Sequence, residues 1–175
     1  MEKRAESSGY RANHEPVSHE VTSGPLLVHG ALPAALRGVL VRNGPNPLRV
    51  DSGQHWFLGH GMVHRFDFSE AGVTYSNRWV RTQRWLAERK GLAPAARSFD
   101  DGVPDGVSYD DGVANTNVLM HAGRLLALEE AHLPIELDRL TLDTLGAVDF
   151  GGVLQGAFTA HPKYDARTGE LLFFG

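Results

Sequence analysis

The sequence predicts an all-β fold, built as an antiparallel meander. Short strand-like runs follow one another closely, and the frequent glycines and prolines (20 and 9 residues) fall between them, where tight turns are expected. Gly61–Phe68 alternates in the manner of a half-buried strand, with Met62, Phe66 and Phe68 on one face. Strands joined in this way can form a barrel, a sandwich or a propeller.

The first half of the chain is predicted to contain one strand and one hairpin. The strand covers Gly38–Arg42 and is expected to stop at Asn43-Gly44-Pro45, because Asn-Gly and Gly-Pro are strong turn signals. The hairpin pairs Gly61–Phe68 with Val73–Arg81 around a turn at residues 69–72.

The remainder is predicted to contain one helix, one long loop and further strands. The helix is expected at residues 83–92, ending at Gly91, and residues 93–112 are loop-like, with repeated Asp-Gly pairs. The predicted strands are 113–121, 124–130, Leu133–Asp138, Thr144–Phe150 and 169–175.

Composition restricts the classes of protein that this chain could represent. Of its 175 residues, 42% are hydrophobic, which is enough for a packed core and argues against extensive disorder. The net charge of −4 argues against a nucleic-acid-binding surface, which needs an excess of basic residues. No cysteine is present, so any metal must be bound by histidine or carboxylate side chains.

Residues 1–24 are predicted to be a flexible leader, followed by one domain over residues 25–175. The segment Met1–Pro16 is polar and aperiodic. It contains no apolar stretch of the kind that a secretory signal needs, and no apolar run in the chain is long enough to cross a membrane. We therefore expect a cytoplasmic protein.

Three of the nine histidines, His55, His60 and His64, are close together in sequence. His60 and His64 have the i, i+4 spacing of a helical metal-binding pair, but the neighbouring glycines and the alternation that follows predict extended backbone. On a strand these two positions lie about 13 Å apart, which is too far to chelate one ion without a bend. The cluster is therefore expected to be structural, as most lone histidines are.

His161 has a more specific setting. Thr159 and Ala160 before it are small, so a partner can approach closely, and Pro162 holds His161 in extended backbone. A turn follows, with Gly169 available for a left-handed position. A ring displayed by stiff backbone suits a preorganised ligand, but one histidine does not make a metal site.

Five stretches occur in the order in which they are found in the carotenoid cleavage oxygenase family. They are LPAALRGVLVRNGPNP, HWFLGHGMVHRFDF, YSNRWVRT, ANTNVLMHAGRLLALEEAHLPIELD and DFGGVLQGAFTAHPKYDARTGEL. The chain resembles this family from about Pro25 to Gly175. The family includes carotenoid and apocarotenoid oxygenases, stilbene-cleaving dioxygenases and the visual-cycle retinoid isomerase.

The resemblance implies both a fold and a metal site. Family members have a seven-bladed β-propeller with a non-haem ferrous iron, Fe(2+), bound by four histidines and supported by three glutamates that accept hydrogen bonds from ligand rings. His161 matches the first iron ligand, in the family's Ala-His-Pro motif, and Glu130 matches the first supporting glutamate, with Glu129 as the less favoured neighbour. The family usually has aspartate in place of His60, a difference that falls on a loop.

The resemblance also implies that this chain is the N-terminal portion of a longer enzyme, truncated at its C-terminus and comprising about two propeller blades. The other three histidine ligands of the family follow the first, and no other histidine here matches their motifs. The final run ELLFFG has no later partner in the chain, which would leave a hydrophobic strand edge bare. The fragment alone is therefore expected to be inactive.

For the complete enzyme, the resemblance implies a dioxygenase that uses Fe(2+) and O2 to cleave a conjugated C=C bond of a carotenoid or apocarotenoid. Its partners are then a small-molecule polyene and O2, without nucleic acid, and peripheral membrane contact stays open for the full-length enzyme. A stilbene-type phenolic substrate is the alternative, although that branch typically has a lysine where this chain has Glu129. A second alternative is a catalytically dead fragment.

Overall fold

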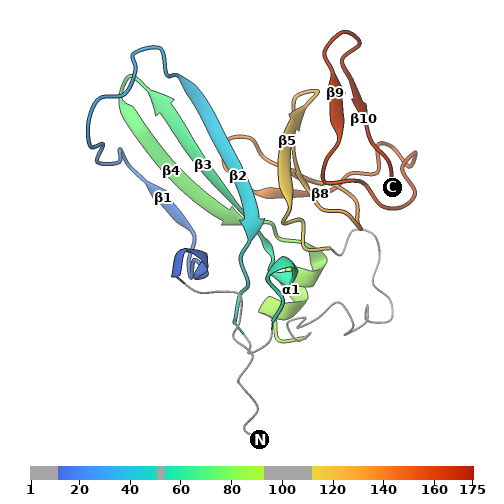
Figure 1. Cartoon of the computed structure of the whole chain (residues 1–175). Coiled ribbons are helices and arrows are strands. Elements are labelled where there is room, and N and C mark those ends of the chain that lie inside the picture. The colour runs from blue at the N-terminus through green and yellow to red at the C-terminus, as the bar shows by residue number, and fades with distance from the viewer. Residues whose placement is uncertain (1–11, 51–53, 93–111) are drawn as a thin grey trace, which may run out of the picture.

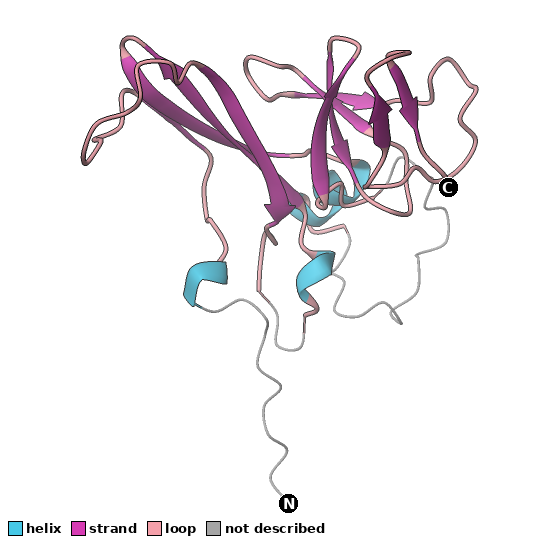
Figure 2. Cartoon of the chain, turned by 45° about the horizontal axis from the view of Figure 1, so that its top comes forward, coloured by secondary structure: helices cyan, strands magenta, loops and turns pink. Residues whose placement is uncertain are grey.

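The computed structural model describes residues 12–50, 54–92 and 112–175, which form three antiparallel sheets. Two sheets have four strands each, in the orders β1-β4-β3-β2 and β5-β6-β7-β8, and the third pairs β9 with β10. The first sheet lies to one side of the other two (Figure 1). The prediction of an antiparallel β fold is confirmed, and strands outnumber helices in the described part of the chain (Figure 2). The predicted loop at 93–112 lies, apart from Gly112, outside those residues.

The first sheet is built around a hairpin of β3 (Gly61–Ser69) and β4 (Gly72–Trp79). The predicted pairing of Gly61–Phe68 with Val73–Arg81 is confirmed, although β4 ends slightly earlier than expected. Gly72 has a φ of +113° at the turn, a conformation that residues with a side chain rarely adopt. The alternating pattern therefore specified both the strands and their pairing.

Strand β2 (Gly38–Pro45) runs further than the sequence predicted. The predicted stop at Asn43-Gly44-Pro45 is wrong, because these three residues continue the ladder with the start of β3. The Asn43 side chain also donates from Nδ2 to the carbonyls of Ala114 and Asn117, at 2.8 and 2.9 Å. Turn propensity is a local preference, and these bonds to a distant segment override it.

Strand β1 (Val21–Ser23) forms an edge of the first sheet, beside β4. The buried Asn77 of β4 accepts a hydrogen bond from the N–H of Val21 at 2.6 Å and donates to the carbonyl of His19 at 3.2 Å. The prediction of a flexible leader up to residue 24 is therefore wrong for this strand, because tertiary contacts order a segment that has no periodic pattern of its own. Residues 1–11 lie outside the described part of the chain.

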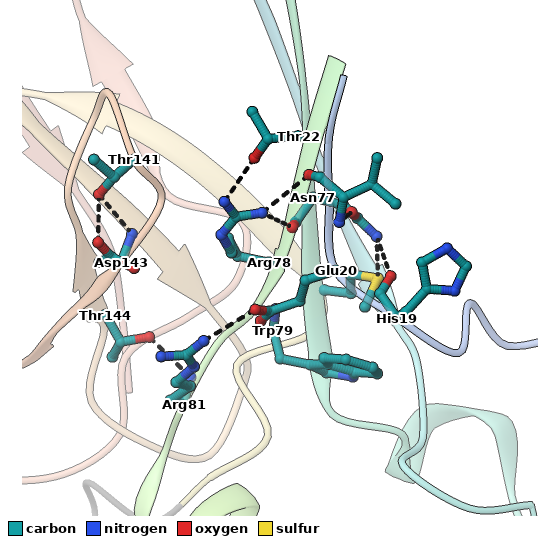
Figure 3. Close-up of polar contacts among 12 residues, drawn as sticks. His19, Glu20, Thr22, Asn77, Arg78, Trp79, Arg81, Thr141, Asp143 and Thr144 are labelled. Atoms are coloured by element: carbon teal, nitrogen blue, oxygen red, sulfur yellow. Dashed lines mark hydrogen bonds and ion pairs between the residues drawn. The ribbon is translucent and has the colours of Figure 1, made fainter. Parts of the chain in front are cut away.

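Polar contacts at the end of β4 connect it to β1 and to the second sheet (Figure 3). The Arg81 guanidinium pairs with Glu20 at 2.9 Å, and the Arg81 N–H donates to Thr144 Oγ1 at 2.8 Å. Arg78 donates to Thr22 Oγ1 at 2.7 Å. The segment that leaves β4 is thus held between both four-stranded sheets.

The second sheet lies within the segments that were predicted as strands. It contains β5 (Asn117–His121), β6 (Arg124–Leu128), β7 (Ile135–Leu137) and β8 (Thr144–Ala147). Each strand pairs with the next along the chain, so the predicted meander is confirmed here.

A hydrophobic core joins the two four-stranded sheets. Its buried residues are Val63, Val80, Ala114, Leu125, Ala127, Ile135, Leu137 and Leu142. Arg65 of β3 is also buried, and it donates to the carbonyls of Arg139 and Leu140 at 2.7 and 2.5 Å. These hydrogen bonds offset the cost of burying its charge, so Arg65 adds a specific contact between the sheets.

The third sheet is a short hairpin of β9 (Lys163–Asp165) and β10 (Glu170–Leu172). Gly169 has the left-handed φ predicted for this turn, +77°, and its N–H donates to the Asp165 carbonyl at 2.8 Å. In the described part of the chain β10 pairs only with β9. The nearby Phe174 is 80% exposed, so the surface beside β10 is apolar.

Helix α1 (Gln83–Arg89) confirms the predicted helix. Thr82 is its N-cap, and the Thr82 Oγ1 accepts a hydrogen bond from the N–H of Trp85 at 3.2 Å. Trp85 and Glu88 are its buried residues, so this short helix is held by tertiary contacts rather than by its length. No helix among the described residues is both long and apolar enough to cross a membrane.

Candidate functional site

The histidine cluster at residues 55–64 does not form one site. His60 is buried, and its Nε2 lies 2.7 Å from the Glu88 carboxylate on α1. His64 bonds to Tyr75, and the His55 Nδ1 accepts from the N–H of Phe57. Among residues 12–50, 54–92 and 112–175, no three histidine or acidic side chains gather closely enough to hold a metal ion. The three rings of this cluster therefore have separate partners.

His64 and Tyr75 form a hydrogen-bonded pair on one face of the first sheet, with 2.8 Å between Nδ1 and the hydroxyl oxygen. Burial lowers the pKa of His64, and the positive charge of Arg42 lowers it further. Burial also raises the pKa of Tyr75. Both shifts favour neutral side chains, so the hydrogen bond joins two uncharged groups.

Replacing His64 with asparagine is expected to flatten the dependence of stability on pH below about 6.5, the ordinary pKa of histidine. Because the folded-state pKa is lowered, the unfolded chain binds more protons between that pKa and 6.5. Stability is therefore greatest above this window and falls as the pH decreases through it. Asparagine offers Tyr75 both a donor and an acceptor but cannot take up a proton.

Urea unfolding of the wild type and the His64→Asn variant at a series of pH values measures this effect. The exposed His19, replaced in the same way, provides the matched control for the loss of an imidazole ring. An equal slope in wild type and His64→Asn would refute the assignment.

The structure brings Glu130 and His161 together, although they are distant in sequence. Ala160, the residue directly before His161, comes 30 positions after Glu130. Glu130 follows the end of β6, and His161 precedes β9. The His161 Nε2 lies 3.2 Å from Glu130 Oε1, and the two side chains are 65% and 55% exposed. Because each histidine ring has two nitrogens, a carboxylate on one leaves the other for a metal ion.

The second carboxylate oxygen of Glu130 holds the backbone that carries His161. Glu130 Oε2 accepts from the Thr159 hydroxyl and from the N–H of Ala160, both at 3.2 Å. The Thr159 hydroxyl in turn accepts from the N–H of His161, also at 3.2 Å. One carboxylate therefore contacts both the ring and the main chain of the same segment, which restricts the orientation of the ring.

Glu129 occupies a different environment from its neighbour. Adjacent residues in extended backbone point to opposite sides, and Glu129 is buried while Glu130 is exposed. Glu129 Oε2 accepts from the N–H groups of Val113 and Ala114 at 2.6 and 2.8 Å, and Oε1 pairs with His132 Nδ1. Of the two glutamates, Glu130 is therefore the one that faces His161.

Glutamine at these two positions is expected to affect different properties, the stability of the chain at Glu129 and iron affinity at Glu130. Glu129→Gln should lower the free energy of unfolding by about 1–3 kcal/mol, because buried N–H groups lose a charged acceptor. Glu130→Gln should change it by at most about 1 kcal/mol, since the side chain is half exposed. In the complete enzyme, Glu130→Gln should weaken iron binding by about 10- to 100-fold.

Urea unfolding and iron titration of both variants measure the two effects, and each variant is the control for the other. A loss of iron affinity in Glu129→Gln alone would mean that the two glutamates have been assigned the wrong way round.

Two contacts near His161 have no signature in the sequence. Thr159 has the small size expected beside a ligand, but its hydroxyl also bridges Glu130 and the His161 N–H. Asn117 donates from Nδ2 to the Ala160 carbonyl at 2.8 Å. Both contacts join segments that are distant in sequence, so no local pattern could have revealed them.

The chemistry of this site suits one ligand of a metal centre. A neutral imidazole that is held by a carboxylate and open to solvent fits ferrous iron, which accepts nitrogen ligands. Within the described ranges, His161 is the ring that lies against Glu130. The roles of His161 as an iron ligand and of Glu130 as its support stay predictions.

Comparisons with known proteins agree with the motifs. A sequence model of the family described as retinal pigment epithelial membrane protein matches residues 14–175. A carotenoid cleavage oxygenase of Mycobacterium tuberculosis is 44% identical over 159 residues, covering 89% of this chain and 30% of that protein. An isoeugenol monooxygenase of Pseudomonas nitroreducens is 39% identical over 165 residues, covering 91% and 34%.

A solved structure gives the same result for the fold. The lignostilbene dioxygenase of Pseudomonas brassicacearum superposes with a TM-score of 0.75 at 35% identity, covering 91% of this chain and 34% of that one. The chain thus spans about a third of the length of the relatives that it matches. On the family match over residues 14–175 and these identities, the chain belongs to the carotenoid cleavage oxygenase family, that of the retinal pigment epithelial membrane protein.

Proposed function

We propose that this chain forms part of a ferrous-iron dioxygenase that cleaves a conjugated C=C bond of a carotenoid or apocarotenoid with O2. The observation that carries the proposal is the contact between His161 Nε2 and Glu130 Oε1, at 3.2 Å, in a chain of this family. The chain supplies one of four histidine ligands, and the others belong to the part of the relatives that it does not span.

The residues of this chain would hold and orient one ligand ring. The Glu130 carboxylate lies 3.2 Å from Nε2 of His161, and such a contact would orient the ring and leave its other nitrogen for a metal ion. Thr159 and the N–H of Ala160 in turn hold the carboxylate of Glu130 in place. Iron bound by such rings supplies the activation of O2.

The two four-stranded sheets are proposed to be adjoining blades of a β-propeller. Each is an antiparallel four-stranded sheet, and a shared hydrophobic core joins them. Radial repetition of such sheets around an axis is how propellers limit exposed strand edges. The candidate ligand lies just after the second of these sheets, on the connection from β8 to β9.

A phenolic substrate is the second candidate, because isoeugenol monooxygenase and lignostilbene dioxygenase are among the relatives. Glu129 stands where the stilbene-cleaving branch typically has a lysine that holds the phenol. Here that position carries a buried carboxylate whose oxygens already bind Val113, Ala114 and His132. It is therefore not available to a phenol, which favours the polyene.

Incubation of the complete enzyme with β-apocarotenals and, separately, with resveratrol-type stilbenes tests the proposal. We expect Fe(2+)-dependent cleavage of the apocarotenal into two carbonyl products, and little turnover of the stilbene. Preferential turnover of the stilbene would select the second candidate, and no cleavage of either by iron-loaded enzyme would refute both.

A further inference from the structure

The backbone of Ala160, directly before the proposed ligand, is buried and bound on both sides by side chains. Ala160 is 0% exposed. Its N–H donates to Glu130 Oε2 at 3.2 Å, and its carbonyl accepts from Asn117 Nδ2 at 2.8 Å. Buried main-chain groups need such partners, so both side chains contribute to the position of this peptide.

The amide of Asn117 is itself held in one orientation. Its Oδ1 accepts from the N–H of Val118 at 2.8 Å, which leaves Nδ2 as the group that faces Ala160. The Asn117 carbonyl accepts from Asn43 Nδ2 at 2.9 Å, so the residue is fixed through its main chain as well. The donor to Ala160 is therefore positioned by two further bonds rather than by the Ala160 contact alone.

Asn117 also lies in register with the end of the strand that leads to Glu130. It is the first residue of β5 and pairs with Leu128, the last residue of β6. Glu130 follows Leu128 by two residues in the chain. One end of the β5–β6 hairpin thus presents both side chains that bind the Ala160 peptide, Asn117 and Glu130.

We propose that Asn117 is a positioning residue for His161. By holding the Ala160 carbonyl, it keeps the His161 ring in contact with Glu130, which would leave the other ring nitrogen for the metal. The assignment deepens the proposed function and rests on it for the metal, but the effect on the Ala160 peptide does not depend on iron. No pattern around Asn117 in the sequence indicates this role.

The first test uses this chain and needs no metal. In an Asn117→Leu variant, which has a similar volume but no donor, amide hydrogen exchange at Ala160 and His161 is expected to accelerate about tenfold relative to the amides of the β3–β4 hairpin. Asn117→Ser, with a hydroxyl too short to reach, is a milder variant that should show the same local change.

Asn115 provides the matched control. It lies two residues away in the same segment and is buried, but its Nδ2 donates to the carbonyls of Phe57 and Gly59 instead. Asn115→Leu should destabilise the chain without a selective change at Ala160 and His161. Equal exchange at these two amides in Asn117→Leu, Asn117→Ser and the control would overturn the proposal.

The second test measures Fe(2+) affinity of the complete enzyme by competition with a chelator. Asn117→Leu is expected to weaken binding by about 10- to 100-fold, and Asn115→Leu to leave it unchanged. Unchanged affinity in Asn117→Leu, with wild-type affinity intact, would overturn the positioning role while the proposed function stands. If the wild type binds no iron, the proposed function fails, and the exchange measurement still decides whether Asn117 holds the His161 segment.

Discussion

Replacing His161 with alanine is expected to remove stoichiometric iron from the complete enzyme while leaving the fold of this chain unchanged. The loss of affinity should exceed the roughly 100-fold that removal of an outer hydrogen-bond partner can cause, because a direct ligand is lost. The side chain is 65% exposed and its ring partner is Glu130, so little packing depends on it. Iron content, Fe(2+) affinity and cleavage activity of the complete enzyme measure the first part, and thermal unfolding of this chain measures the second.

His121→Ala is the matched control for this experiment. His121 ends β5, and its ring lies edge-on to Tyr164 at 6.0 Å, so it is a second histidine near the β9–β10 hairpin without contact to Glu130 among the bonds described. Its replacement should leave iron binding intact. Full iron occupancy in His161→Ala would refute the ligand assignment, and a large loss of stability would make His161 a structural residue.

Phe158→Ala is expected to lower the free energy of unfolding of this chain by about 3–5 kcal/mol, the usual cost of removing a buried aromatic ring. Phe158 is 1% exposed and packs in a core with Leu126 and Leu128 of β6. Its N–H donates to the His132 carbonyl at 3.2 Å, so it also anchors the start of the segment that carries His161. Urea unfolding of both proteins measures the difference.

Phe173→Ala controls for the loss of an aromatic ring at the same place. The two rings are in contact, with centroids 4.1 Å apart, but Phe173 is 42% exposed. Its replacement should cost well under half as much, because less apolar surface is buried. Two results would show that the core around Phe158 does not hold the His161 segment. One is an equal loss of unfolding free energy in both variants, and the other is a loss of less than about 1 kcal/mol in Phe158→Ala.

Secondary structure was predictable where a local sequence pattern and the tertiary contacts favour the same element. The alternation in Gly61–Phe68 specified the β3–β4 hairpin, and the turn glycines, Gly72 and Gly169, have the positive φ angles that their positions require. Helix α1 was likewise predicted from its composition and the glycine after it. In each case the local preference and the tertiary contacts agree.

Two local predictions were wrong because distant contacts decided the outcome. Asn43-Gly44-Pro45 has the composition of a turn, but Asn43 bonds to Ala114 and Asn117 while its own strand continues along β3. The segment at Val21 has no periodic pattern, but Asn77 binds its backbone. Asparagine can satisfy main-chain groups of any neighbouring segment, and its partner cannot be read from its sequence context.

The candidate site, too, was predictable only in part from the sequence. The motif around His161 indicated a displayed ring, and the resemblance pointed to Glu130 ahead of Glu129. The structure places Glu130 beside His161 and directs Glu129 to the N–H groups of Val113 and Ala114. Two adjacent glutamates look alike in a sequence, and the direction in which each side chain points depends on how the strand packs against the core.

The sequence by itself therefore determined the family, the strands and the residues from which a site could be built. Tertiary structure alone decided which of them meet: Glu130 with His161, Thr159 with Glu130, and Asn117 with the Ala160 carbonyl. The physical reason is that periodicity and turn chemistry act over a few neighbouring residues. These contacts instead join segments that come together only when the sheets pack on a common core.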